Sequence, residues 1–300
     1  MAVTIPFVRD MSFAYGEAQQ VSALITRVVA DNPGPFTFRG TGVYIVGREE
    51  VAVIDPGPDD APHLDALKRA LAGKRVSHIF VTHRHLDHSP AARPLAAATG
   101  AKIYASGIAP RFSADDFVAE AGDDLGFKPD VVVKDGDTFR GAGWTLEAIM
   151  TPGHTSDHMC LALREENALF SGDHVMGWST TVVSPPDGDM TAYLASLDKI
   201  AARGFATLWP THGPPVTDVA PFLAAYRAHR LDREAQVIAR LEAGQKRIRD
   251  MVPVMYAAVD PGLYPAATHS VLAHMIRLVQ SGRVQTSGAP GLDSDYTLSP

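Results

Sequence analysis

Three histidines and one aspartate crowd into six residues of the chain: His83, His85, Asp87 and His88. They directly follow residues 76–81, a short apolar run that is typical of a buried strand. A loop at the end of a strand can direct such side chains toward one point. Imidazole nitrogens and carboxylate oxygens suit zinc, and also iron or manganese. The cluster therefore predicts a metal site, in preference to a polar loop with surface histidines.

Three more side chains that can bind metals follow other strand-like runs. His154 comes after residues 144–150, Asp173 after a run that ends at Ser171, and His212 after residues 207–209. A glycine beside each of them lets the backbone turn tightly. Together with the first cluster they make seven candidate ligands, which is enough for two metal ions and too many for one tetrahedral zinc.

Other polar residues near these positions are expected to play different roles. His158 lies four residues after His154 and is expected to support a ligand or face the substrate. His174 follows Asp173 directly, and adjacent residues on a strand face opposite ways, so His174 is not expected to be a ligand. The hydroxyl-bearing residues 179–181 are expected either to contact substrate or to form a polar turn.

The elements that must position these residues alternate between strand-like and helix-like segments over the first two thirds of the chain. Strands are expected at residues 21–30, 42–46, 51–55, 76–81, 103–105, 131–133, 144–150, 159–163, 168–171 and 207–209, and helices at 61–71 and 190–202. A further helix is expected after Ser89, with Ser89 as its N-cap and Pro90 in its first turn.

Strand-like runs stop near Pro221. Helices are expected at residues 222–243, 248–258 and 268–281, and a short hairpin is expected to begin at residue 283. On the third helix, His269, His274 and Arg277 are expected to face outward. The Gly/Ser/Asp-rich residues 287–300 are expected to be mobile. This pattern predicts a catalytic domain at residues 1–216 and a small winged-helix-like module at residues 217–300.

The order of these motifs, HxHxDH, then TPGH, SGD and THG, resembles the metallo-β-lactamase superfamily over roughly residues 20–215. The resemblance implies an α+β fold, the αββα sandwich, with the metal ions at one edge of its two sheets. It also implies the following ligands: His83, His85 and His154 for the first metal, Asp87, His88 and His212 for the second, and Asp173 as a bridge. Asp55, at the end of the run VAVID, matches a position that supports the metal loops in this superfamily, although such a residue is also common in plain turns.

A finer resemblance points to one branch. One large group of true β-lactamases has a cysteine where this chain has Asp173, and the aspartate is similar to glyoxalase II, lactonases and ribonuclease Z-type enzymes. The segments NPGPFTFRGTG, PGHTSDHMCL and LFSGDHVMG look like the lactamase-beta-two-like proteins, which carry a C-terminal winged-helix-like domain. Penicillin-type activity is therefore expected to be weak or absent. Cys160 lies in the apolar run MCLAL and is expected to be buried and inert.

The leading interpretation is a metal-dependent hydrolase of a small molecule. A hydroxide shared by two divalent ions, most readily zinc, would attack an ester, thioester or lactone carbonyl. Asp173 would bridge the ions, and Asp87 would also orient the nucleophile. One alternative is cleavage of single-stranded RNA. Four arginines could form a basic face for its phosphates, although a solvated helix face would explain them equally well: Arg227, Arg230, Arg233 and Arg240. Another is a non-catalytic binding, lid or dimerisation role for the C-terminal module.

Composition limits the classes of protein to consider. The chain has 300 residues, 46% of them hydrophobic and 20% charged, which is ordinary for a globular protein. The net charge of −7 argues against nucleic-acid binding over the whole surface, although residues 222–283 carry nine basic and five acidic residues. With a single cysteine, no membrane-length apolar run and no signal-peptide pattern, we expect a cytoplasmic protein, and a homo-oligomer remains open.

Overall fold

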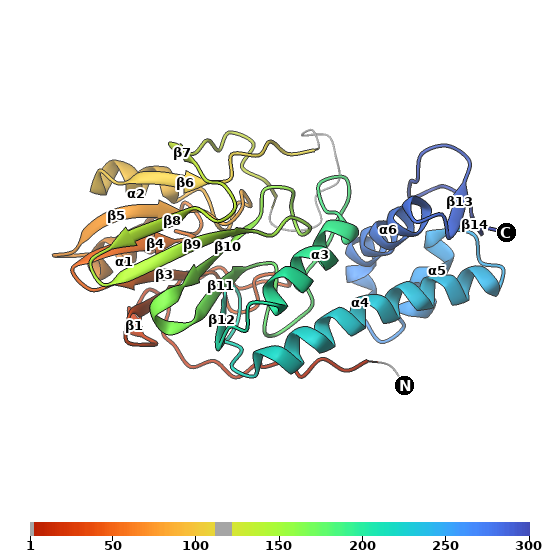
Figure 1. The fold of residues 1–300 in the computed structure, drawn as a ribbon, viewed down its shortest axis with the longest axis horizontal. Coiled ribbons are helices and arrows are strands. Elements are labelled where there is room, and N and C mark those ends of the chain that lie inside the picture. Colours follow the sequence, from red (N-terminus) through yellow and green to blue (C-terminus); the bar gives the residue numbers. More distant parts are fainter. Residues whose placement is uncertain (1–2, 112–121) are drawn as a thin grey trace.

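Two β-sheets stack face to face in the computed structural model, which describes residues 3–111 and 122–300 (Figure 1). The first sheet has seven strands in chain order: β1 Gln19–Gln20, β2 Ile25–Val29, β3 Gly42–Gly47, β4 Glu50–Ile54, β5 Arg75–Phe80, β6 Lys102–Ala105 and β7 Val131–Val132. The second has five, in the order β12 Thr207–Pro210, β11 Ala168–Gly172, β10 Met159–Leu163, β9 Trp144–Met150 and β8 Thr138–Gly141.

Alternation along the strands assigns apolar side chains to different layers. On β9, Leu146 and Ala148 pack in the core between the sheets, whereas Ile149 packs in the core under the helices. On β10, Leu161 faces the other sheet and Cys160 faces outward to the helices. This period of two is what a sheet buried on both faces requires.

Helices cover the outer face of each sheet. Helices α1 (Ala61–Ala70) and α2 (Ala92–Thr99) pack on the first sheet, and α3 (Met190–Ala201) packs on the second with the first half of α4 (Val219–Glu242). The predicted αββα sandwich is therefore confirmed. Cys160 is fully buried, as expected, and burial raises the pKa of its thiol to about 12.

Strand direction explains why the candidate ligands meet. Strands β4 and β5 are parallel in the first sheet, and β11 and β12 are parallel in the second. Strand β9 also runs with β11, because β10 is antiparallel to both. The loops that follow these strands all leave from the ends that face one edge of the sandwich, which is where the histidine-rich segments lie.

The C-terminal part has its own core beyond the sandwich (Figure 1). It contains α5 (Ile248–Met255), α6 (Tyr264–Gln280) and the antiparallel pair β13 (Val284–Thr286) and β14 (Tyr296–Leu298). The chain also forms short 3₁₀ turns at Arg164–Glu166 and Pro261–Leu263. Helix α4 joins the two parts, since Phe222 packs in the core under the second sheet and Val237 packs in the C-terminal core. No described helix is both long and apolar enough to cross a bilayer.

Several local expectations were wrong. Residues 287–300 are not a mobile tail: they contain β14, and Tyr296 is fully buried, with its hydroxyl donating to the Gly291 carbonyl at 2.7 Å. Ser89 does not cap α2, because its hydroxyl instead donates to the Arg84 carbonyl at 3.1 Å. The strand expected at 21–30 begins only at Ile25, since Val21 bonds back to the Ile25 carbonyl in a turn.

The expected outward face of the third C-terminal helix was also wrong. His269 and His274 are both buried, because α6 packs against α4 and α5 on more than one side. Helix α6 begins earlier than expected, at Tyr264, with Pro265 in its first turn, where proline costs no hydrogen bond.

Candidate metal centre

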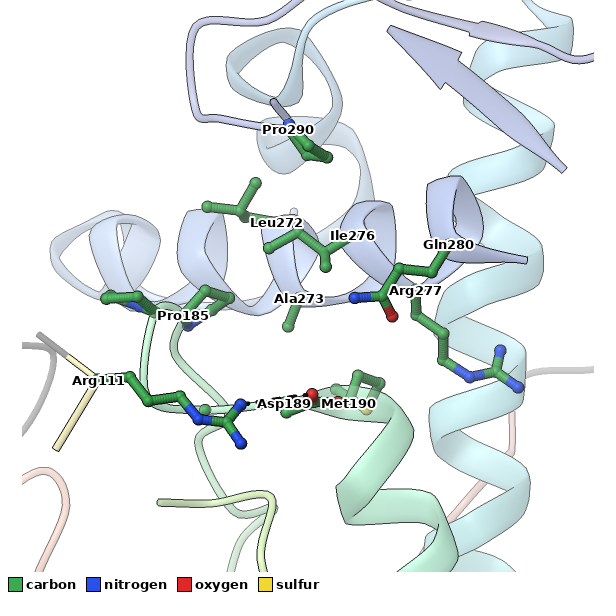
Figure 2. Close-up of a pocket in the computed structure, with 12 residues that line it drawn as sticks. Arg111, Pro185, Asp189, Met190, Leu272, Ala273, Ile276, Arg277, Gln280 and Pro290 are labelled. Atoms are coloured by element: carbon green, nitrogen blue, oxygen red, sulfur yellow. Dashed lines mark ion pairs between the residues drawn. The ribbon is translucent and has the colours of Figure 1, made fainter. Parts of the chain in front are cut away.

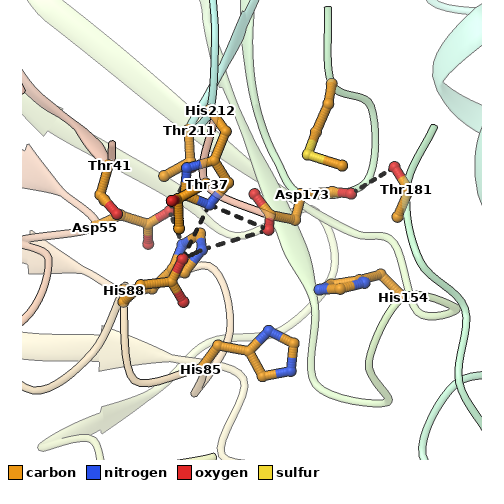
Figure 3. A network of polar contacts seen from close by, with 12 residues as sticks. Thr37, Thr41, Asp55, His85, His88, His154, Asp173, Thr181, Thr211 and His212 are labelled. Atoms are coloured by element: carbon orange, nitrogen blue, oxygen red, sulfur yellow. Dashed lines mark hydrogen bonds and ion pairs between the residues drawn. The ribbon is translucent and has the colours of Figure 1, made fainter. Parts of the chain in front are cut away.

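The seven predicted ligands come together at the edge of the sandwich, and all seven residues are buried. Figure 3 shows five of them: His85, His88, His154, Asp173 and His212. Three overlapping groups each bring three ligand atoms within 4.8 Å of one another. The groups are His83, His85 and His154; His83, His88 and Asp173; and Asp87, His88 and His212. The structure therefore brings together every residue that the sequence singled out for the metal site.

The first group consists of neutral imidazoles. His83 Nε2 and His85 Nδ1 lie only 2.9 Å apart, so both nitrogens face the same point. Burial and the neighbouring histidines hold the pKa of His83 well below its usual value and lower that of His85 to about 3. The pKa of His154 is also lowered, chiefly by burial. Three neutral imidazoles are suitable ligands for a divalent metal.

The second group combines histidines with carboxylates. His212 Nε2 lies 3.0 Å from Asp87 Oδ2 and 3.4 Å from Asp173 Oδ2, and His88 Nε2 lies 3.5 Å from each of the same two oxygens. Burial lowers the pKa of His212, but the two carboxylates outweigh it and raise the value to about 10. Asp55 adds to the same effect on His88, whose pKa is raised well above normal against the effect of burial.

Hydrogen bonds on the outer side of the rings fix their orientation. Asp55 is the centre of this support: its carboxylate accepts from the Thr82 amide (2.7 Å), the Thr82 hydroxyl (2.8 Å) and the Thr211 hydroxyl (3.0 Å), and lies 3.0 Å from His88 Nδ1. Because the Thr82 hydroxyl donates to Asp55, it can accept from His83 Nδ1 at 3.1 Å. His83 and His88 therefore both turn Nε2 toward the centre, which is how outer partners orient metal ligands in general.

Backbone carbonyls support two further rings. His154 Nδ1 lies 2.7 Å from the Val182 carbonyl, and His212 Nδ1 lies 3.2 Å from the Gly40 carbonyl. A carbonyl only accepts, so each of these nitrogens carries the proton in the neutral ring, and Nε2 is left as the ligand atom.

His158 lies behind the centre and does not belong to any of the three ligand groups. Its Nδ1 is 2.8 Å from the Thr151 hydroxyl, and its Nε2 accepts from the Asp173 amide at 3.2 Å. Gly172 lets the ring come this close: its φ is +53°, and a Cβ there would lie 2.5 Å from His158 Nε2. His158 thus holds the backbone that carries Asp173.

The donor set fits a pair of divalent metal ions. Two buried side-chain atoms of these ligands, His88 Nε2 and Asp173 Oδ1, have no hydrogen-bond partner among the described residues. Such atoms are costly in a protein interior unless a ligand satisfies them. Imidazole nitrogens with carboxylate oxygens are the ligand types that zinc, iron and manganese share.

Sequence reasoning missed one layer of support. The Arg84 side chain, inside the histidine motif, forms a buried ion pair with Asp157 at 2.9 Å, and Asp123 Oδ2 lies 3.9 Å from His85 Nε2. The backbone of residues 122–124 also bonds to that of residues 84–86, at 2.9 Å in both directions. Only the presence of an arginine between two histidines hinted at a buried acidic partner.

Three of the arginines of α4, Arg227, Arg230 and Arg233, do not form one exposed basic face. Arg227 pairs with Asp198 at 2.6 Å, and Arg230 is only 3% exposed and donates to the Thr181 carbonyl. Arg233 donates to the Met255 carbonyl at 2.8 Å and stacks over Tyr256. These three arginines therefore do not form one exposed face, because Arg227 pairs with Asp198 of α3 whereas Arg230 and Arg233 are turned toward other parts of the chain.

Sequence profiles of two families match the chain. The profile of the metallo-beta-lactamase superfamily matches residues 37–212, and that of the beta-lactamase associated winged helix domain matches residues 248–291. Lactamase-like protein adaB of Aspergillus niger is 29% identical, over 100% of this chain and 98% of its own. The beta-lactamase-like protein 2 homolog of Caenorhabditis elegans is 32% identical over 89% of this chain and 88% of its own.

Further similarities concern activity and metal content. Atrochrysone carboxyl ACP thioesterase AgnL7 of Paecilomyces divaricatus is 33% identical over 75% of this chain and 67% of its own. Among solved structures, a beta-lactamase domain protein from Burkholderia ambifaria superposes with a TM-score of 0.80 at 22% identity, covering 98% of this chain and 97% of that one. The protein TTHA1623, described in a di-iron-bound form, superposes with a TM-score of 0.50 at 25% identity, covering 66% of this chain and 96% of that one.

Proposed function

Because this chain belongs to the metallo-β-lactamase superfamily of hydrolases, we propose that it hydrolyses small acyl thioesters at a centre of two divalent metal ions. The observation that carries the proposal is the convergence of five histidines and two aspartates, all buried, on one point. His83, His85 and His154 would hold one ion, and Asp87, His88 and His212 the other, with Asp173 between them. When bound, such ions lower the pKa of water and polarise a carbonyl.

Zinc is the metal that this donor set would bind most readily, with iron and manganese as alternatives. The number of ligands supports two ions in preference to one, since seven are too many for one tetrahedral zinc. The all-histidine group contains no carboxylate, whereas the second group contains carboxylates that raise the pKa of His88 and of His212. A cation in the second group would be stabilised by the same carboxylates.

The remaining work of catalysis would fall on the two aspartates. Asp173 has two oxygens, of which Oδ2 faces His88 and His212 and Oδ1 has no hydrogen-bond partner in the described part of the chain, so the carboxylate could contact both metal positions. Asp87 Oδ2 lies in the same group, where the carboxylate can accept a hydrogen bond from the attacking water and orient it.

Among carbonyl substrates, thioesters have the strongest support. Several relatives are named atrochrysone carboxyl ACP thioesterases, and the matched region spans two thirds or more of each of them. One of these relatives, from Aspergillus chevalieri, is 34% identical to this chain. Esters and lactones present the same electrophilic carbon and are the alternatives within this proposal.

A substrate panel on the zinc-loaded protein tests the proposal. It would include a butyryl thioester, a butyryl ester, a γ-lactone, a penicillin and a single-stranded RNA, with Asp173→Asn as the inactive control. We expect turnover of the thioester, and a loss of at least a thousandfold in the variant. Efficient cleavage of RNA or penicillin with no thioester turnover would refute the proposal.

A further inference from the structure

A second feature of the molecule, separate from the metal ligands, concerns a cavity where the sandwich meets the C-terminal part. The cavity has a volume of about 230 Å³ and lies between residues 176–182 and α4 on one side and residues 256–270 on the other. Three basic or imidazole side chains of α4 line it: His229, Arg230 and Arg233. No carboxylate belongs to the lining that the described residues provide.

The charge of Arg230 is only partly satisfied. This side chain is 3% exposed, its guanidinium donates to the Thr181 carbonyl and lies over the Tyr193 ring, and its Nε has no partner among the described residues. Burying a cation without a counter-charge is strongly unfavourable. Arg233, the next cation along α4, is held by the Met255 carbonyl, the Gln236 side-chain oxygen and the Tyr256 ring, and it forms no ion pair with a described carboxylate.

Other residues that line the cavity are consistent with a positive electrostatic potential inside it. Burial, followed by the charges of Arg230 and Arg233, lowers the pKa of His229 to about 4. Ser179, Thr180 and Ser270 line the same cavity, and their side chains carry hydroxyl groups, which can donate hydrogen bonds. Cations and hydroxyl donors around a space free of carboxylates are the chemistry that binds an oxyanion.

The cavity shares a wall with the metal centre. Thr181 lines the cavity, and its hydroxyl donates to the Asp173 carbonyl at 2.8 Å (Figure 3). Val182 also lines the cavity, and its carbonyl holds His154 Nδ1 at 2.7 Å. The cavity therefore lies directly beside the metal centre, one residue layer away from Asp173 and His154.

A larger cavity nearby does not share these properties. It has a volume of about 410 Å³ and lies between α6 and the loop before α3 (Figure 2). Its two arginines are already neutralised, since Arg111 lies 3.8 Å from Asp189 and Arg277 is bonded to Glu234. It therefore serves as the comparison and not as the candidate site.

We propose that the cavity lined by Arg230 and Arg233 binds an oxyanion of the substrate, so that the preferred thioesters carry a carboxylate or phosphate at a distance from the scissile carbonyl. This inference rests on the proposed function, which supplies the thioester. The anion has two sources: a carboxylate on the acyl part, or a phosphate on the carrier to which the acyl group is attached.

Thioether analogues, which cannot be hydrolysed, test binding independently of turnover. The three probes are neutral S-butyl-N-acetylcysteamine, its S-(3-carboxypropyl) counterpart for the carboxylate, and S-butyl coenzyme A for the phosphate. Calorimetry on the zinc-loaded protein should show at least tenfold tighter binding of one anionic probe than of the neutral one. The anionic probe that binds more tightly than the neutral one identifies the source of the oxyanion.

Substitutions of the arginines test whether a preference for anionic probes arises from this cavity. Arg230→Gln and Arg233→Gln should each reduce the anionic preference to within about threefold, while Arg111→Gln, in the comparison cavity, should leave it unchanged. If Arg230→Gln does not fold, Arg233→Gln decides alone. Absence of any anionic preference in the parent protein, or a preference that survives Arg233→Gln, would overturn the inference. Turnover of a neutral butyryl thioester would in that case still support the proposed function.

Discussion

At the scale of single residues, Asp173 is the carboxylate that we expect to connect the two metal positions. It lies between His88 and His212, and its backbone is held by His158 and Thr181. Asp173→Ala should lower kcat at least a thousandfold and reduce the bound metal, because the two metal positions would lose the carboxylate that connects them. The fold should persist, since Asp87 and Asp55 still lie beside the two histidines that Asp173 contacts.

Steady-state kinetics, metal analysis and circular dichroism check this prediction. The matched control is Asp198→Ala, an exposed aspartate that pairs with Arg227 and should leave all three measurements unchanged. Activity of Asp173→Ala within tenfold of the parent, about 1.4 kcal/mol of barrier, would mean that Asp173 is not at the reaction centre.

The charges of the centre predict how metal binding depends on pH. Without metal, the pKa of His212 is raised to about 10 by Asp173 and Asp87 against the effect of burial. The ion pairs that it forms therefore stabilise the metal-free protein fully below pH 6.5, and this stabilisation is lost as pH rises toward 10. Over the same window a metal ion must displace the proton, so the metal affinity should rise about tenfold per pH unit for each proton released.

Competition with a chelator between pH 7 and 9 measures this slope, and calorimetry in two buffers of different ionisation enthalpy measures the protons. The thermal stability of the metal-free protein should fall over this range while that of the zinc-loaded protein holds. A zinc affinity that does not change over these two pH units would show that His212 is not protonated in the metal-free centre.

Most residues of the candidate site can be predicted from the local spacing of residues in the sequence. All seven candidate ligands could be identified from the sequence because each follows a short apolar strand, and the ends of these strands meet at one edge. Asp123 and Asp157 could not, because their partners are about 40 and 70 residues away and neither sits in a recognisable motif. The spacing of the arginines predicts an exposed Arg230, but this side chain is buried. Spacing along one helix does not report which other segments pack against it.

At the scale of elements, the turn after β11 depends on one glycine. Gly172 adopts a left-handed φ of +53°, and an added Cβ would meet the buried His158 ring at 2.5 Å. Gly172→Ala should destabilise the protein by about 1–2 kcal/mol from the backbone alone, and by more because the ring must move. The displaced ring would release the Asp173 amide, so metal content should also fall.

The chain offers a matched control in Gly136, which has a φ of +83° but nothing within 4 Å of an added Cβ. Gly136→Ala should show only the backbone cost and normal metal binding. Denaturant unfolding and metal analysis of both variants separate the two effects. Equal destabilisation, with metal content unchanged in both, would argue against a role for His158 in holding Asp173.

The boundaries of helices and strands were less predictable than their presence. The predicted start of the third C-terminal helix is residue 268, four residues after the observed start at Tyr264, because the helix accommodates Pro265 in its first turn. Strand β14 was not predicted, because a Gly/Ser/Asp-rich segment gives no sign that Tyr296 fills the C-terminal core. Contacts between distant segments decide such features, and composition alone does not report them.

At the scale of the whole molecule, α4 ties the sandwich to the C-terminal part. Its first half carries Phe222, Leu223 and Tyr226 into the core under the second sheet, and its second half carries Val237 and Leu241 into the C-terminal core. The Tyr226 hydroxyl also donates to the Ser179 carbonyl at 2.6 Å, within the segment that leads from Asp173 to the wall of the metal centre. The first half of the helix is thus part of the catalytic core, while a division of the chain at residues 216 and 217 remains a prediction.

Two truncations test how far the catalytic unit extends. A chain ending at Leu231 keeps the three apolar residues and Arg230, and it should fold and bind two equivalents of zinc. A chain ending at Thr217 loses them, together with the Tyr226 hydrogen bonds. Complete burial of one large apolar side chain contributes about 1.5–3 kcal/mol, so the loss of three is comparable with the whole stability of a typical domain. We therefore expect the shorter chain to aggregate or to unfold at a much lower temperature. Size-exclusion chromatography, circular dichroism and zinc analysis distinguish the two chains. If the chain ending at Thr217 folds and binds zinc as well as the longer one, α4 belongs to the C-terminal module throughout its length, and its contacts with the second sheet contribute little to stability.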